Sequence, residues 1–295
     1  MRESGKSKGG LLQVLEKSGI VEVALDPPRR TMVDALVRGI SVGDHSRRHQ
    51  GIKSTRLAST GFWFTESSEF TQWVRGKGDK TGRVLLCQGI PGAGKSVLTS
   101  LVIDQLTTQF QDNPTVGLTY AYFNPDLDSK LTLHDALSVL LGQMLLLALE
   151  GRGVSSDVSA RLAKFYDGSF KPSLSSLLDL FEEAIRSLPD GQIFVVLDGI
   201  DALSFDISSD LLGYMHRFME RFSALKLYVS SNWGIEHQFK EQFDSYTSLE
   251  IRAHDDDLVS YLRHRIESPP SLVDRLTAKV LNMILASGKS ATCGM

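Results

Sequence analysis

Residues 85–98 read LLCQGIPGAGKSVL, and this stretch decides the fold expected for the chain. Within it, residues 89–96 match the Walker A pattern G-x-x-x-x-G-K-[ST] at every fixed position. A nearly continuous apolar run, 83–88, precedes the pattern, and VLTSLVIDQL after it places apolar residues at helical spacing. A strand, a loop of small residues and a helix are the parts of a phosphate site, because loop amides and the helix N-terminus both face the anion.

The tripeptide Gly-Lys-Ser occurs three times, and only the middle copy has this context. Residues 5–7 follow no strand pattern, while residues 288–290 follow a helical pattern and lack a first glycine at the required spacing. We interpret these two copies as a polar tail and a helix end. Residues 94–96 are the expected phosphate site.

The loop residues have separate expected roles in binding ATP or ADP with Mg²⁺. The three glycines and Ala93 leave room for the loop amides to approach phosphate oxygens, Lys95 bridges the outer phosphates as a catalytic charge, and the Ser96 hydroxyl coordinates the metal. The expected nucleotide-contacting set is Gly89, Ile90, Pro91, Gly92, Ala93, Gly94, Lys95, Ser96 and Val97.

A second acidic element is expected in IFVVLDGIDAL, residues 193–203. Asp198 ends the apolar run, where a carboxylate meets Mg²⁺ through water, and Asp201 is a candidate catalytic residue that positions the attacking water. Capping of the next helix fits Asp201 nearly as well. A third polar group, Ser230, Ser231 and Asn232, ends another apolar run and is interpreted as a turn in preference to a phosphate sensor.

Composition bounds the classes of function. The formal charge of −3, from 32 basic and 35 acidic residues, gives no field that favours nucleic acid. Two cysteines, Cys87 and Cys293, are too few for a disulfide framework or a zinc cluster, which fits a cytoplasmic location. The longest apolar run of the most apolar helical segment, 144–149, is too short to span a membrane.

Alternating apolar runs and helical patterns predict an α/β fold with a parallel five-stranded sheet. Together with the motif at residues 89–96, this predicts the three-layer sandwich of a P-loop NTPase. Two helix starts have capping signals, at Thr132 with Asp135 and at Ser173. Roughly 100 residues separate the loop from Asp198, which leaves room for an additional strand between them. The five strands are expected at 83–88, 117–123, 193–197, 225–230 and 248–251.

Four regions are expected along the chain. A variable leader occupies residues 1–45, and residues 46–82 form a segment with one short helix, in which Phe70 and Trp73 lie at helical spacing. The nucleotide-binding domain occupies residues 83–253. Two helical patterns, 254–266 and 272–285, lie in the last region, 254–295, and begin a helical subdomain.

Several motifs together resemble the NACHT-type NTPases of the STAND class, in particular the fungal NLR-like receptors. STGFWFTESSEFTQWV, residues 59–74, resembles the aromatic segment that precedes the loop in that family, and GIPGAGKSVLTS resembles its Walker A motif. YAYF and VVLDGIDAL resemble its second strand and its acidic motif. The resemblance implies a nucleotide-exchange switch for signal transduction in non-self recognition or cell death, with oligomerisation or related signalling chains as partners.

Three departures from that family shape the expectation. Ala202 stands where the family usually has a second carboxylate, so hydrolysis is expected to be slow or impaired. Asn232 stands where the family usually has arginine, which removes a charged contact to the terminal phosphate. The chain ends at LASGKSATCGM where relatives continue, and the expectation is a truncated receptor or an altered gene model.

Two alternatives to a hydrolysing switch stay open on the sequence alone. One is a nucleotide-binding interaction module without turnover that acts through partner assembly, which Ala202 and Asn232 favour. The other is a metabolic P-loop kinase, for which the sequence offers no lid-like cluster of arginines. No nucleic acid and no membrane span are expected among the interactions of the chain.

Overall fold

A five-stranded parallel sheet forms the centre of the computed structural model, which describes residues 42–76, 82–113, 115–125, 131–151, 172–187 and 191–267. The order of the strands is β2-β3-β4-β1-β5, and every neighbouring pair is parallel. The predicted α/β fold class is confirmed. The strands are β1 (Val84–Gln88), β2 (Gly117–Tyr122), β3 (Ile193–Asp198), β4 (Leu225–Ser231) and β5 (Thr247–Glu250).

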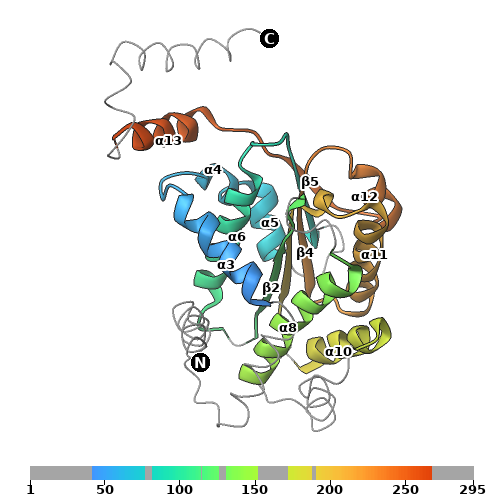
Figure 1. Cartoon of the computed structure of the whole chain (residues 1–295). Coiled ribbons are helices and arrows are strands. Elements are labelled where there is room, and N and C mark those ends of the chain that lie inside the picture. The colour runs from blue at the N-terminus through green and yellow to red at the C-terminus, as the bar shows by residue number, and fades with distance from the viewer. Residues whose placement is uncertain are drawn as a thin grey trace, which may run out of the picture.

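Helices flank the sheet (Figure 1). The pattern at 254–266 corresponds to the last described helix, whereas the pattern at 272–285, the outer Gly-Lys-Ser copies and Cys293 lie outside the described residues. The helices are α3 (Val42–Thr55), α4 (Phe62–Thr65), α5 (Ser68–Arg75), α6 (Lys95–Phe110), α8 (Leu133–Gly151), α10 (Leu174–Ser187), α11 (Phe205–Arg221), α12 (Glu236–Gln242) and α13 (Asp255–Glu267), with a 3₁₀ turn at η2 (Ile200–Ala202).

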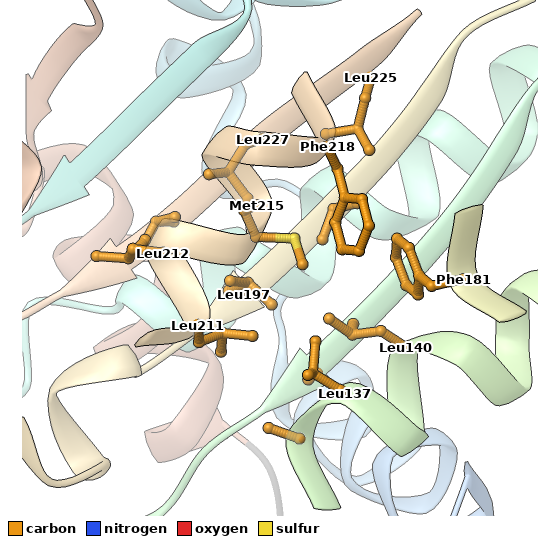
Figure 2. Close-up of a cluster of buried hydrophobic side chains, with 14 of the residues drawn as sticks. Leu137, Leu140, Phe181, Leu197, Leu211, Leu212, Met215, Phe218, Leu225 and Leu227 are labelled. Atoms are coloured by element: carbon orange, nitrogen blue, oxygen red, sulfur yellow. The ribbon is translucent and has the colours of Figure 1, made fainter. Parts of the chain in front are cut away.

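Each face of the sheet has its own hydrophobic core. Alternate strand residues such as Leu197 and Leu227 pack under α8, α10, α11 and α12, and Figure 2 shows Leu140, Phe181 and Met215 converging on them. The opposite face carries α4, α5 and α6. All residues of β1, β3 and β4 are buried, because these central strands are covered on both faces. Their continuous apolar runs follow from that position.

The predicted helix starts are confirmed at two places. The backbone amide of Thr132 donates to the Asp135 carboxylate (3.0 Å), and the amide of Asp135 donates back to the Thr132 hydroxyl (3.2 Å). At α10, the Ser173 hydroxyl accepts from the amide of Ser176 (3.2 Å). Both contacts satisfy amides that have no partner within their helix.

Helix α3 was not predicted, and it crosses the predicted boundary between residues 45 and 46. Its contacts with the rest of the fold are largely polar: His45 Nδ1 accepts from the amide of Tyr122 (3.0 Å), and Arg48 donates to the carbonyl of Tyr122 (2.7 Å). His45 and His49 are nonetheless buried. A helix that docks through histidine and arginine leaves no apolar period in its sequence.

Strand β2 lies at an edge of the sheet, and polar side chains hydrogen-bond to the backbone groups on its outer side. The Gln143 amide, on α8, accepts from the backbone N–H of Tyr120 (2.9 Å) and donates to its carbonyl (2.7 Å), as a neighbouring strand would. His45 satisfies the amide of Tyr122 at the end of the same strand. An unpaired edge can pair with a strand from another chain. Gln143 and His45 already bind the backbone groups of Tyr120 and Tyr122 that such a strand would use.

Asp104 connects α6 to α3 and to Arg56, the residue that follows α3. Its carboxylate accepts from Arg56 (2.5 Å), Lys53 (2.9 Å) and His49 (3.2 Å). Partial burial raises the pKa of Asp104, but these three hydrogen bonds outweigh it and hold the pKa well below its usual range. The ionised form of Asp104 is therefore the one that binds α3.

We expect Asp104→Asn to release α3. Three positively charged or polar partners lose a common anion, which should lower the free energy of unfolding by about 2 kcal/mol and speed hydrogen exchange of the α3 amides. Chemical denaturation and hydrogen exchange measure the two effects. Asp112→Asn, an exposed aspartate just after α6, is the matched control and should change neither. Unchanged α3 exchange in Asp104→Asn would contradict this role.

Lys226 on β4 binds the end of α5 from inside the fold. Its ammonium donates to the carbonyls of Trp73 and Val74, both at 2.7 Å, and lies 5.6 Å from the ring centre of Phe194. A cation is favourable at a helix C-terminus, yet burial lowers the pKa of Lys226 to about 8, from 10.5. The protonated form of Lys226 is therefore less favourable in the folded protein than in the unfolded chain.

This shift predicts a pH dependence of stability. Between about pH 8 and 10.5 the unfolded chain holds a proton on Lys226 that the folded chain has released, so the free energy of unfolding should rise with pH across that window. Urea denaturation at several pH values measures the slope. Lys226→Met should remove this contribution, while Lys240→Met, at an exposed lysine, should retain it. Equal slopes in wild type and Lys226→Met would rule the assignment out.

Candidate functional site

The predicted phosphate loop lies between the carboxyl end of β1 and the start of α6. Gly94 caps α6 with φ of 92°, and Gly92 has φ of 83°, conformations that favour glycine. A Cβ at either position would meet nothing within 4 Å, so the space around both residues is open. Helix α6 begins at Lys95 and directs its first amides toward this loop.

Gly89 is required for a different reason. The chain just after β5 passes so close that a Cβ at Gly89 would overlap the carbonyl oxygen of Ile251. The amide of Gly89 also donates to the carbonyl of Ser231 (3.3 Å), and the amide of Ile251 donates to the carbonyl of Gln88 (2.6 Å). The start of the loop is thereby held between β4 and β5.

The Lys95 ammonium folds back onto its own loop. It donates to the carbonyls of Gly89 (2.8 Å) and Ile90 (2.9 Å) and to Asn232 Oδ1 (2.7 Å). Burial lowers the pKa of Lys95, while the carboxylates of Asp201 and Asp198 oppose that shift. All three of its N–H donors have protein acceptors in this arrangement.

Asp198 ends β3 as a buried carboxylate within a group of hydroxyls. It is 2 % exposed, and its Oδ1 accepts from Ser230 (2.6 Å) and lies 2.6 Å from Thr99 Oγ1. Ser96 also hydrogen-bonds to it. Burial raises the pKa of Asp198, and the hydroxyls of Ser230, Ser96 and Thr99 lower it in part.

Asp201 lies beside the end of β4. Its two carboxylate oxygens accept from the backbone amide of Asn232 (3.0 Å) and from Asn232 Nδ2 (2.6 Å). Asn232 thus connects Asp201 to Lys95, although a turn was the interpretation favoured for it from the sequence. The 3₁₀ turn at residues 200–202 carries Asp201 to this position.

Sequence reasoning missed Thr99 as a partner of Asp198 and gave little weight to Ser230. A signal existed for Thr99, because position i+4 places it on the same face of α6 as Lys95. Its hydroxyl lies 3.0 Å from the Lys95 carbonyl, the usual helix contact of threonine, as well as near Asp198. The role of Ser230 depends on the pairing of β3 with β4, which the sequence alone did not give.

Two oxygen groups, Ser96 and Asp198, are available for a metal at this site. No group of three or more His, Cys, Asp or Glu suited to a metal ion occurs among the residues that the structure describes. Mg²⁺ commonly binds through one or two protein groups, water and substrate phosphates, and a buried carboxylate with a raised pKa is stabilised by such a cation. The donors therefore fit Mg²⁺ bound together with phosphates.

The aromatic segment before the loop packs on the sheet and reaches α13. Trp73 donates its indole N–H to the carbonyl of Leu227 (3.1 Å) in the core. Trp63 donates to Asp257 (3.2 Å) and stacks on His254, with ring centres 5.0 Å apart. The amide of Gly61 donates to the same carboxylate (2.9 Å). Elements before and after the sheet are thus joined directly.

Three large apolar side chains are exposed in the segments that follow strands of the sheet. Ile90 follows β1 with 63 % exposure, Phe205 follows β3 with 62 %, and Trp233 follows β4 with 48 %. In a parallel sheet the carboxyl ends of the strands share one edge, so these segments leave the sheet on the same side as the phosphate loop.

Comparison with known proteins gives one family and several structural similarities. The family model described as Nephrocystin 3, N-terminal, matches residues 59–232, more than half of the chain. The match begins in the aromatic segment and ends at Asn232, so it contains the loop and both aspartates. The comparison with curated proteins found no match.

The similar solved structures are distant. The Orc1 protein of Aeropyrum pernix, solved in complex with DNA, is 18 % identical, with a TM-score of 0.47, 76 % of this chain covered and 52 % of that chain. A Walker-type ATPase of Pyrococcus abyssi is 16 % identical, with a TM-score of 0.45, 80 % of this chain covered and 64 % of that chain. The chain thus spans about half the length of the Orc1 protein. Similarity at this level carries nothing about ligands.

In the described part of the chain, no helix combines the length and apolar character that crossing a bilayer requires.

The burial of Asp198 predicts a conflict between stability and metal binding. Asp198→Asn removes a buried charge while keeping the side-chain shape, so the protein without nucleotide should gain about 1 kcal/mol in free energy of unfolding. Thermal and urea denaturation test this. Asp210→Asn, an exposed aspartate on α11, is the control and should have no effect. A clear loss of stability in Asp198→Asn would show that the ionised carboxylate supports the fold.

Proposed function

The chain belongs to the Nephrocystin 3, N-terminal, family, and from this and the geometry of the loop we propose that it binds a nucleoside di- or triphosphate with Mg²⁺ and acts as a molecular switch. The observation that carries the proposal is the position of the Lys95 ammonium. It lies between the glycine-rich loop at the start of α6 and Asn232, which follows β4. The strand next to β4, β3, ends at the buried Asp198.

The residue roles follow from chemistry. Backbone amides of the loop between β1 and α6 and the N-terminus of α6 surround the phosphates, and Lys95 moves from its loop carbonyls to the outer phosphates. Ser96 and Asp198 hold Mg²⁺, which neutralises phosphate charge when bound. Asp201 is the candidate for positioning water. The Lys95 ammonium exchanges three neutral acceptors for phosphate anions, which favours binding.

The finer proposal is a NACHT-type STAND switch of the fungal NLR-like kind, located in the cytoplasm, that signals in non-self recognition or programmed cell death. It is supported by the motifs of residues 59–74 and by their contacts with α13. Because Asp257 and His254 bind Trp63, a change at the nucleotide can move the segment before the loop and the helix after the sheet together. Residues 83–253 form the proposed nucleotide-binding domain, between the segment 46–82 and the helical arm that begins at 254.

Hydrolysis is proposed to be slow. Both oxygens of Asp201 are occupied by Asn232, and the neighbouring Ala202 offers no second carboxylate to orient water. The second candidate is therefore an interaction module that binds nucleotide without turnover and assembles with copies of itself or related signalling chains. The exposed apolar side chains of Ile90, Phe205 and Trp233 favour it, because such residues are common at interfaces.

Calorimetric titration of the whole chain with Mg-ADP and Mg-ATP tests the proposal. We expect saturable binding in wild type, and at least a tenfold weaker affinity in Lys95→Ala, since a charge-assisted contact to phosphate contributes about 1.5–3 kcal/mol. Asp198→Ala should lose the dependence of binding on Mg²⁺. Lys240→Ala, at an exposed lysine of α12, should bind as wild type does.

Two outcomes would decide against these proposals. If well-folded wild type shows no saturable uptake of either nucleotide, the nucleotide-binding function fails. If Lys95→Ala binds as tightly as wild type, the loop is not the site. Single-turnover hydrolysis then separates the two candidates, because tight binding with no release of phosphate selects the module without turnover.

A further inference from the structure

Asn232 has a side-chain orientation that its partners determine. A lysine ammonium only donates and an ionised carboxylate only accepts, so the amide oxygen must face Lys95 (2.7 Å) and the amide nitrogen must face Asp201 (2.6 Å). The backbone amide of Asn232 also donates to Asp201 (3.0 Å). Asp201 therefore binds Asn232 at two points and fixes which end of the side chain faces Lys95.

The sheet order places this amide on the path of a long phosphate chain. Strand β4 ends at Ser231, one residue before Asn232, and lies between β1, which leads into the loop, and β3, which ends at Asp198. A phosphate chain that extends from the loop toward Asp198 must pass the end of β4. A diphosphate held by the loop and Lys95 is shorter by one phosphate and reaches less far along this path.

We propose that Asp201 acts as a specificity-determining residue through Asn232: it turns the Asn232 amide oxygen toward the phosphates and thereby makes the site prefer nucleoside diphosphate over triphosphate. The inference rests on the proposed nucleotide-binding function. An amide oxygen and a terminal phosphate oxygen are both acceptors, so they compete for the Lys95 ammonium and repel each other at close range. An amide nitrogen in the same place donates to the phosphate instead.

Releasing the amide should reduce the preference for diphosphate. In Asp201→Ala, nothing holds Asn232 Nδ2 away from the phosphates, and the side chain can rotate so that Nδ2 donates to the terminal phosphate. A hydrogen bond to a charged group changes affinity by roughly tenfold or more. The ratio of the dissociation constants for triphosphate and diphosphate should fall by about that factor. The function of Asp201 would then be to position Asn232 and not water.

The experiment is a double-mutant cycle on the full chain. Dissociation constants for Mg-ADP and for the non-hydrolysable analogue Mg-adenylyl imidodiphosphate are measured in wild type, Asp201→Ala, Asn232→Ala and the double variant. Wild type should favour ADP, each single variant should reduce that preference, and the double variant should resemble Asn232→Ala. Asp206→Ala, an exposed aspartate in the first turn of α11, controls for the loss of one negative charge.

A nucleotide-free readout tests the orientation by itself. In ¹⁵N-labelled protein the Asn232 side-chain amide protons should be protected from exchange in wild type and lose that protection in Asp201→Ala, whereas Asp206→Ala should retain it. Unprotected amide protons in wild type would overturn the inference without reference to any ligand.

The binding outcomes separate the two levels of proposal. If wild type binds neither nucleotide, the nucleotide-binding function fails and the preference fails with it. If wild type binds both but Asp201→Ala keeps the ratio within twofold of wild type, only the preference is overturned. The same holds if Asp201→Ala changes the ratio equally in the Asn232→Ala background, because Asp201 would then act through its charge alone.

Discussion

The position of β1 between β4 and β5 is the constraint on which the site depends. Gly89 at its end is held by the carbonyl of Ser231 on one side, and the carbonyl of Gln88 accepts from Ile251 on the other. The absence of a side chain at Gly89 lets β5 approach the start of the loop. This placement brings Lys95 next to the end of β4 and makes its contact with Asn232 geometrically possible.

Buried polar groups in this chain are arranged so that their partners come from distant parts of the sequence. Asp198 has hydroxyls from α6 and β4, Lys226 has carbonyls from α5, and Asp104 has two donors from α3 and a third from Arg56, which follows α3. A buried or partly buried ion costs free energy unless such partners are in place. These contacts therefore favour one docking of α3, α5 and α6, in addition to the less specific contribution of the two apolar cores.

Different parts of the fold were predictable to different degrees. All five strands were found, and the three central ones, β1, β3 and β4, were clear because buried parallel strands read as apolar runs. The starts of α8 and α10 were found because capping residues act locally. Helix α3 was not found, because His45, Arg48 and Asp104 hold it through polar contacts that have no sequence period. Asn232 was interpreted as a turn residue, since nothing near it in the sequence reveals Lys95 or Asp201.

The sequence by itself determined the α/β class, the strand-loop-helix unit around residues 83–106, and the candidate residues Lys95, Ser96 and Asp198, because each of these follows from residues close together in the chain. The order of the strands, the hydroxyl shell of Asp198 and the link from Lys95 through Asn232 to Asp201 were decided only by tertiary structure. The physical reason is that parallel pairing brings the ends of β1, β3 and β4 together although more than 100 residues lie between the first and the last of them.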